Sequence, residues 1–193
     1  MRKFQEMGMI DAGRVAAILL AAGRGTRFGA DKLSWPVGGR PLGVYAARAL
    51  LALPFSMRIA VTPPRGIRYD DLGFIRVEND HPELGMAHSI RLGVGEAQRR
   101  GADAVLIVLA DMPFVPSAHL AALLARYRDG ASIIASEASH PGPPVLFGRS
   151  WFSRLAALEG DKGAGAWLAG AQTVACETHW LLDIDTKADL AAF

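Results

Sequence analysis

A short segment near the amino terminus combines glycines with positive charges. The glycines are Gly23, Gly25 and Gly29, and the cations among and after them are Arg24, Arg27 and Lys32. Glycine has no Cβ, so it lets the backbone turn sharply and approach a ligand closely. Backbone N–H groups in such a turn form an anion-binding concavity, which nearby cations reinforce. The spacing therefore predicts a cradle for a polyphosphate, and the alternative is an ordinary tight turn.

Two known glycine motifs do not match this spacing. A phosphate-binding P-loop has Lys-Ser or Lys-Thr directly after its last glycine, whereas Gly29 is followed by Ala30 and Asp31. A dinucleotide fingerprint has two residues between its second and third glycines, whereas this segment has one residue more and carries Arg27 there. The mismatch disfavours a nicotinamide-dependent oxidoreductase.

A second candidate group is the carboxylate of Asp111. It follows residues 104–110, which are the most apolar run of the chain and are predicted to form the central strand. A carboxylate at the end of a buried strand is costly unless it lies in a cleft or is paired. Such a carboxylate can hold Mg²⁺, which prefers one or two protein carboxylates together with substrate phosphates and waters. The alternative is a turn or helix-capping role before Pro113.

Two further segments carry candidate polar groups. Ser89 and Arg91 lie in the first turns of a predicted helix, where they could add donors for a base or a phosphate. Asp183 and Asp185 precede the last predicted helix and offer more carboxylates. The alternative for the latter segment is a helix entry with Thr186 as its N-cap.

The elements that position these groups alternate along the chain. Apolar runs predict strands over residues 15–22, 57–62, 74–78, 104–110, 132–136 and 171–177, with another strand entered from the Pro/Gly-rich residues 139–147. Helical patterns cover residues 42–53, 81–100, 117–128 and 151–158. This alternation predicts βαβ units and an α/β fold with a mostly parallel sheet. Such sheets bind ligands at the carboxyl ends of their strands, where the glycine segment and Asp111 fall.

Composition excludes several classes of protein. The 193 residues carry a net charge of +2 and one cysteine, which disfavours nucleic-acid binding and excludes an internal disulfide. No apolar run approaches the about 18 residues of a membrane span. Residues 1–13 have no apolar core typical of a secretory signal, so we predict a loose leader, a single domain over 14–193 and a cytoplasmic location.

Residues 20–32 resemble the opening motif of the MobA/MocA-like nucleotidyltransferases. The Ala21-Ala22-Gly23 form is more similar to the cytidylyl-transferring MocA branch. Four later segments are also similar to motifs of this family, at residues 85–93, 111–113, 142–147 and 183–186. A fifth, at residues 160–164, is similar as well, although Gly165 stands where relatives often carry arginine. Pro143 likewise departs from the family pattern, in a loop that is expected to contact the acceptor.

The resemblance implies a fold, a reaction and a set of residues. The fold would be a three-layer, Rossmann-like α/β nucleotidyltransferase fold with a mostly parallel central sheet. The reaction would be Mg²⁺-dependent transfer of CMP from CTP to the phosphate of molybdopterin, with release of pyrophosphate. The implied nucleotide-binding residues are Ala21, Ala22, Gly23, Arg24, Gly25, Thr26, Arg27, Lys32, Ser89, Arg91 and Asp111.

The same resemblance implies a role for each charged residue. Arg24 and Arg27 would grip the β and γ phosphates, and Lys32 would stabilise charge at the α-phosphate. Arg24, Lys32 and Asp111 would therefore be catalytic, and Asp111 with Asp183 or Asp185 would hold Mg²⁺. An acceptor phosphate is already ionised near neutral pH and needs no general base, which fits the absence of a Ser/His/Asp-type arrangement.

Two alternatives remain open at this point. One is the same chemistry with another donor or acceptor, such as GTP or a sugar phosphate. The other is a non-catalytic chaperone that binds the cofactor and delivers it to a recipient molybdoenzyme, which predicts binding without pyrophosphate release.

Overall fold

The computed structural model describes residues 14–23, 28, 31–128, 130, 132–160 and 163–193. In this part of the chain, seven strands form one sheet in the order β5-β4-β1-β6-β8-β7-β9. The strands are β1 (Val15–Leu20), β4 (Met57–Thr62), β5 (Ile75–Glu78), β6 (Ala104–Leu109), β7 (Ile133–Glu137), β8 (Pro141–Gly148) and β9 (Gln172–Ala175). β8 is antiparallel to both of its neighbours, and every other pair is parallel. The predicted α/β class and mostly parallel sheet are confirmed.

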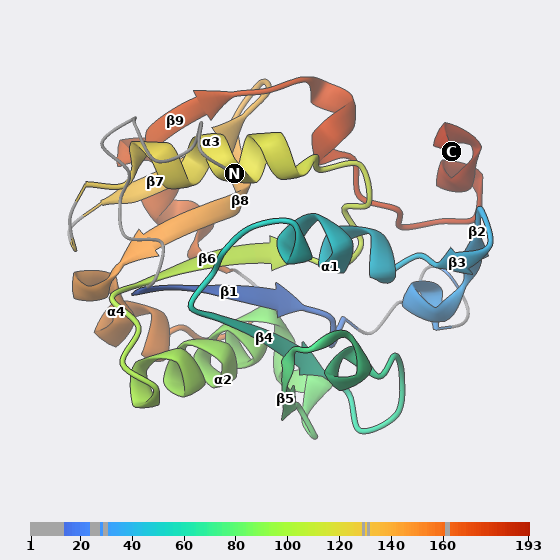
Figure 1. The fold of residues 1–193 in the computed structure, drawn as a ribbon, viewed down its shortest axis with the longest axis horizontal. Coiled ribbons are helices and arrows are strands. Elements are labelled where there is room, and N and C mark those ends of the chain that lie inside the picture. The colour runs from blue at the N-terminus through green and yellow to red at the C-terminus, as the bar shows by residue number, and fades with distance from the viewer. Residues whose placement is uncertain (1–13, 24–27, 29–30, 129, 131, 161–162) are drawn as a thin grey trace.

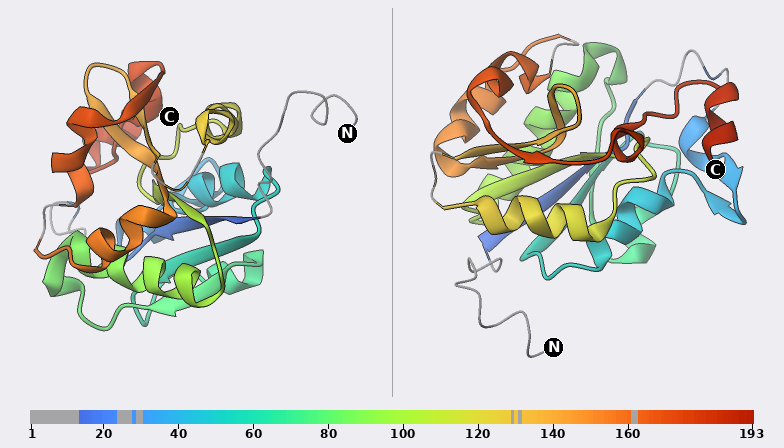
Figure 2. Two further views of the ribbon diagram at one scale, coloured as in Figure 1. Left: turned by 90° about the vertical axis from the view of Figure 1, so that its left-hand side faces the viewer. Right: turned by 90° about the horizontal axis from the view of Figure 1, so that it is seen from above.

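Helices cover both faces of the sheet. The α-helices are α1 (Val44–Leu51), α2 (Gly85–Arg99), α3 (Ser117–Arg126) and α4 (Phe152–Ala156). α1 and α3 pack on one face, and α2 and α4 pack on the other (Figures 1 and 2). The predicted three-layer arrangement is therefore confirmed.

Strand β1 lies inside the sheet next to the predicted central strand β6, and both of its faces are buried. Its odd-numbered side chains join the core under α1 and α3, and its even-numbered side chains join the core under α2. Its neighbours are β4 and β6, both parallel to it. The uncharged run from residue 15 meets this need, since a strand buried on both faces has no place for a polar side chain.

Helix α2 approaches β1 closely at Gly93. A Cβ at this position would lie 2.7 Å from Cγ2 of Ile18 and 3.1 Å from Cγ2 of Val61. The missing side chain is therefore what allows the helix to sit this low on the sheet. This packing fixes the amino end of α2 beside the carboxyl ends of β1 and β4.

Short elements depart from the sequence prediction. Residues 35–41, for which the sequence predicts no strand or helix, form the hairpin of β2 (Pro36–Val37) and β3 (Arg40–Pro41). The expected loop over residues 139–147 largely belongs to β8, because pairing on both sides draws it into the sheet.

The remaining turns are 3-10 helices: η3 (Lys32–Ser34), η4 (Tyr69–Leu72), η5 (Pro82–Leu84), η6 (Arg149–Trp151), η7 (Ala164–Gly170), η8 (Thr178–Leu181) and η9 (Ala188–Ala192). The last predicted helix is thus a 3-10 turn.

Candidate active site

Lys32 and two carboxylates meet at the carboxyl end of the central strands. Lys32 Nζ donates to Asp111 Oδ2 at 2.7 Å and to Asp185 Oδ1 at 3.0 Å. The Lys32 side chain is 9% exposed, so its charge lies almost wholly inside the protein. Three segments far apart in the sequence therefore bring one cation and two anions together.

Each of these side chains is held by its own local structure. Lys32 begins η3, whose N-cap Asp31 accepts hydrogen bonds from the backbone N and the hydroxyl of Ser34. Asp111 follows the end of β6 by two residues. Its carbonyl accepts a hydrogen bond from the backbone N of Ile184 at 3.0 Å, which places the Asp185 segment against it.

The turn at Asp185 is organised by Asp189. Oδ2 of Asp189 accepts from the backbone N of Asp185 at 2.9 Å, and from the backbone N and hydroxyl of Thr186 at 2.7 and 3.0 Å. These donors favour the ionised form, so the pKa of Asp189 is lowered. The alternative of a helix entry with Thr186 as its N-cap is wrong, because the N-cap of η9 is Lys187 and makes no side-chain capping bond. Thr186 and Asp189 instead shape the Asp185 turn.

Residues before and after the turn anchor this segment to the hairpin side of the molecule. Ile184 is fully buried with Phe28 and Leu42. The ring of Phe193 packs against those of Phe114 and Tyr45, at centroid distances of 4.7 and 5.1 Å. The carboxyl-terminal segment therefore lies beside the β2–β3 hairpin (Figures 1 and 2).

The site is dominated by negative charge. Burial acts to lower the pKa of Lys32, but the adjacent Asp111 and Asp185 outweigh it and raise the pKa, so the ammonium is charged at neutral pH. Asp183 is exposed to solvent. The protein around its carboxyl group nevertheless reduces hydration of the carboxylate, and this raises its pKa to about 6. The negative charges of Asp111 and Asp185 add to that increase.

The donor set of this site fits a hard divalent cation. Asp111 and Asp185 direct one oxygen each toward the same point, which the Lys32 ammonium occupies. Two carboxylates plus phosphate oxygens and waters are what Mg²⁺ prefers. Among the described residues, no three His, Cys, Asp or Glu side chains are arranged to hold a metal ion. The assignment of Asp111, Asp183 and Asp185 as metal ligands therefore stays a prediction, and only two of them face Lys32.

The predicted polyphosphate cradle is described in part. The backbone N of Ala21 donates to Val61 O at 2.8 Å, and Ala22 is buried. Among the described residues other than its chain neighbours, no atom lies within 4 Å of the place where a Cβ of Gly23 would stand. The remaining predicted cradle residues, Arg24, Gly25, Thr26 and Arg27, lie outside the described residues.

Ser89 and Arg91 are engaged within the protein. Ser89 is buried, and its hydroxyl accepts a hydrogen bond from Asn79 Nδ2 at 2.9 Å. Arg91 Nη2 lies 2.8 Å from Nδ1 of His88. Asn79 also accepts from the backbone N of His81, so it ties the end of β5 to the start of α2. The nucleotide-binding roles of Ser89 and Arg91 stay predictions.

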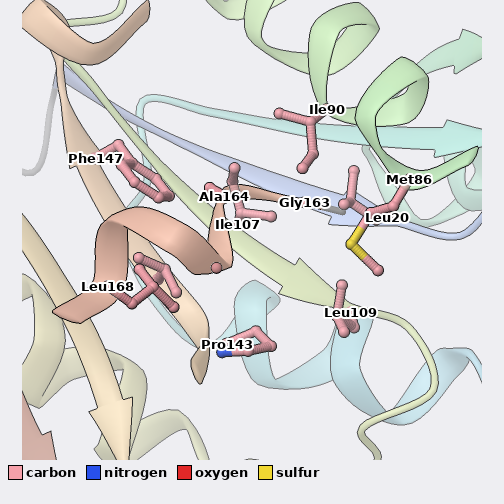
Figure 3. A pocket seen from close by; sticks show the side chains of 12 residues that line it. Leu20, Met86, Ile90, Ile107, Leu109, Pro143, Phe147, Gly163, Ala164 and Leu168 are labelled. Carbon is pink, nitrogen blue, oxygen red and sulfur yellow. The ribbon is translucent and has the colours of Figure 1, made fainter. Parts of the chain in front are cut away.

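A cavity of about 250 Å³ opens on the α2 face of the sheet (Figure 3). It lies between β1, β6, β8, α2 and η7, and its lining is almost entirely apolar. Side chains that face it include those of Leu20, Met86, Leu109, Pro143, Phe147 and Leu168. Leu109 ends β6 and precedes Asp111 by two residues, so the strand that leads to Asp111 also supplies one wall of the cavity. Sequence reasoning missed it, because its lining comes from apolar positions that read as ordinary core.

Comparison with known proteins identifies the family. Residues 17–176 match the MobA-like NTP transferase domain. The chain belongs to this family. It is 30% identical to the purine catabolism protein PucB of Bacillus subtilis, over 89% of this chain and 92% of PucB. It is also 30% identical to the molybdenum cofactor guanylyltransferase of Cereibacter sphaeroides, over 92% of this chain and 94% of that protein.

Solved structures agree on the fold. A nucleotidyl transferase from Methanothermobacter thermautotroptrophicus superposes with a TM-score of 0.76, at 23% identity, over 92% of this chain and 94% of that one. Rv0371c from Mycobacterium tuberculosis, solved as a complex with manganese, superposes with a TM-score of 0.71 at 22% identity, over 92% and 96%. At this identity the likeness establishes the fold alone.

The family match confirms a nucleotidyltransferase domain. It does not confirm the cytidylyl branch that the Ala21-Ala22-Gly23 form favours, and the molybdenum cofactor relative is named as a guanylyltransferase. In the described part of the chain, no helix is both long and apolar enough to span a membrane.

Proposed function

We propose that this MobA-like domain transfers a nucleoside monophosphate from a nucleoside triphosphate to the terminal phosphate of a molybdopterin-type acceptor in the cytoplasm. The observation that carries the proposal is the convergence of Lys32, Asp111 and Asp185 at the carboxyl end of β1 and β6. Ligands of such sheets bind at this edge.

In the proposed reaction, an oxygen of the acceptor phosphate attacks the α-phosphorus of the triphosphate. A new P–O bond forms, the bond to the bridging oxygen breaks, and pyrophosphate leaves with the electron pair. The Lys32 ammonium would donate to an α-phosphate oxygen, where charge accumulates in the transition state. A Mg²⁺ held by Asp111 and Asp185 would neutralise phosphate charge when bound. Since the attacking oxygen is already ionised, no general base is required.

CTP is the proposed donor, because Ala21-Ala22-Gly23 resembles the cytidylyl-transferring form. GTP is the second candidate, and a specific observation favours it: the relative that spans nearly the whole chain and acts on the molybdenum cofactor is named a guanylyltransferase. We propose that the cavity binds the acceptor rather than the nucleotide. Its apolar lining suits the face of a fused ring better than a sugar, whose hydroxyl groups would lack partners there.

The experiment measures pyrophosphate release with purified molybdopterin and each of CTP, GTP, ATP and UTP, with and without Mg²⁺. A thermal-shift series with the same nucleotides reports binding, and about 2.7 kcal/mol of added stability is expected at a hundred times the dissociation constant. Release with CTP identifies the cytidylyl reaction, and release with GTP the guanylyl reaction. Binding of nucleotide and molybdopterin without release would indicate the chaperone and contradict catalysis.

A matched pair of variants assigns the signal to the site. Asp111→Asn removes the carboxylate at the carboxyl end of β6, and we expect release to fall by at least a hundredfold, or about 2.7 kcal/mol. Asp103→Asn removes a similarly exposed carboxylate at the opposite end of the strand, where it pairs with Arg14 and Arg149. We expect that variant to keep its activity.

A further inference from the structure

Lys32 occupies the place that a divalent cation would need. Its ammonium is within 3.0 Å of one oxygen of Asp111 and one of Asp185, and its side chain is 9% exposed. These two oxygens are the ones directed toward a common point. Among the described residues, the lysine is therefore a cation that offsets the negative charge of both carboxylates.

A metal ion and this ammonium exclude one another. Mg²⁺ binds carboxylate oxygens at about 2.0–2.1 Å, so a bound ion would stand within a few ångströms of the nitrogen. Like charges at that distance repel strongly even where the surroundings are polar. The described residues also offer no cluster of three ligating side chains that would compensate for the repulsion. A metal can enter only if the ammonium moves to another anion.

We propose that Lys32 holds the metal position in the free protein and yields it only when a triphosphate arrives. The proposal rests on the proposed function, because the α-phosphate is the anion that receives the lysine. The four-carbon stem of lysine can move its charge without changing the backbone. Lys32 thus sets the order of binding: the metal enters with the nucleotide, and metal alone binds weakly.

The test uses Mn²⁺ alone as the probe, followed by electron paramagnetic resonance in the absence of nucleotide. Lys32→Met should bind Mn²⁺ at least about tenfold more tightly than the wild-type protein, since it removes the competing charge. Lys187→Met is the matched control: it removes the same charge from a lysine that lies over the Trp35 ring, 4.8 Å from its centroid. Its Mn²⁺ affinity should remain that of the wild-type protein.

A result in which Lys32→Met binds Mn²⁺ no more tightly than the wild-type protein would overturn the proposal. Lys32→Gln provides a second neutral variant if the methionine variant does not fold, which circular dichroism reports. A non-hydrolysable CTP or GTP analogue should raise the Mn²⁺ affinity of the wild-type protein more than that of the neutral variant, because only the wild-type protein has an ammonium that the triphosphate can draw away from the carboxylates. An equal rise in Mn²⁺ affinity in the wild-type protein and the neutral variant would also contradict the proposal that Lys32 yields the metal position to the triphosphate.

The proposed function fails in a different way. If molybdopterin yields no pyrophosphate with any nucleotide, the transfer reaction is wrong, whereas the Mn²⁺ titration still reports whether Lys32 excludes the metal. Conversely, the wild-type protein could release pyrophosphate while loss of Lys32 leaves the Mn²⁺ affinity unchanged. That result would support the transfer reaction and contradict the proposal that Lys32 occupies the metal position.

Discussion

The backbone N of Ile184 donates to the carbonyl of Asp111 at 3.0 Å, so the two acidic segments of the site are joined directly through their main chains. The Ile184 side chain is fully buried against Phe28 and Leu42. This contact determines where the next residue, Asp185, presents its carboxylate.

Ile184→Ala should therefore weaken both the fold and the site. We expect a loss of about 2–4 kcal/mol in the free energy of unfolding from the cavity that it leaves. Turnover should also fall, because Asp185 is no longer held toward Lys32. Urea unfolding and the pyrophosphate assay measure the two effects. The exposed Leu182→Ala should change the stability by less than about 0.5 kcal/mol, and an equal loss there would contradict the account.

Two glycines of α2 should respond in opposite ways to alanine. Gly93→Ala introduces a Cβ 2.7 Å from Ile18, and we expect overpacking of about 1–3 kcal/mol to exceed the gain of about 1 kcal/mol in helix propensity. Gly95→Ala meets no atom within 4 Å and should stabilise the protein by about 0.5–1 kcal/mol. Urea unfolding of the two variants tests the pair, and stabilisation in both would show that α2 can move away from β1.

His119 should make the protein sensitive to acid. Its Nε2 lies 2.8 Å from the hydroxyl of Ser136, which donates its hydrogen to Pro144 O, so Nε2 is assigned as the donor. Burial lowers the pKa of His119 below its ordinary value of 6.5. Below pH 6.5 the unfolded chain takes up a proton that the folded protein does not, so the free energy of unfolding falls as pH decreases.

The variant His119→Gln keeps a donor for Ser136 but does not titrate. Between about pH 5 and pH 8, its stability should vary less with pH than that of the wild-type protein. His140→Gln, at an exposed position, should keep the wild-type profile. Urea unfolding across this range measures the difference. Identical profiles for His119→Gln and the wild-type protein would rule out His119 as the source.

Filling the cavity should weaken binding of the acceptor without changing binding of the nucleotide. Ala164 lines the cavity, whereas Ala166 in the same turn is exposed. Ala164→Phe should raise the KM for molybdopterin by at least about tenfold, or about 1.4 kcal/mol, and leave nucleotide binding unchanged. Ala166→Phe should alter neither quantity. A change in nucleotide affinity alone for Ala164→Phe would assign the cavity to the donor.

The sequence prediction was accurate where local composition determines an element and inaccurate where the element depends on contacts with other segments. Strand β6 was predicted over residues 104–110 and found over Ala104–Leu109, because a run buried on both faces has an unambiguous composition. The antiparallel β8 was expected to be mostly loop, since proline and glycine indicate turns when neighbouring strands are unknown. The final helix is a 3-10 turn, because Asp189 is committed to the Asp185 turn.

The sequence by itself determined the class of fold, the edge at which ligands are expected and the identities of Lys32, Asp111 and Asp185 as candidates. These follow from local composition, from motif spacing and, for Asp185, from the resemblance to the family's closing motif. Only the tertiary structure decided that Lys32 joins Asp111 to Asp185, and that an apolar cavity opens between β1, β6, β8, α2 and η7. The physical reason is that both features depend on contacts between segments far apart in the chain. Hydrophobic periodicity indicates which faces are buried, but it does not specify which distant side chains meet.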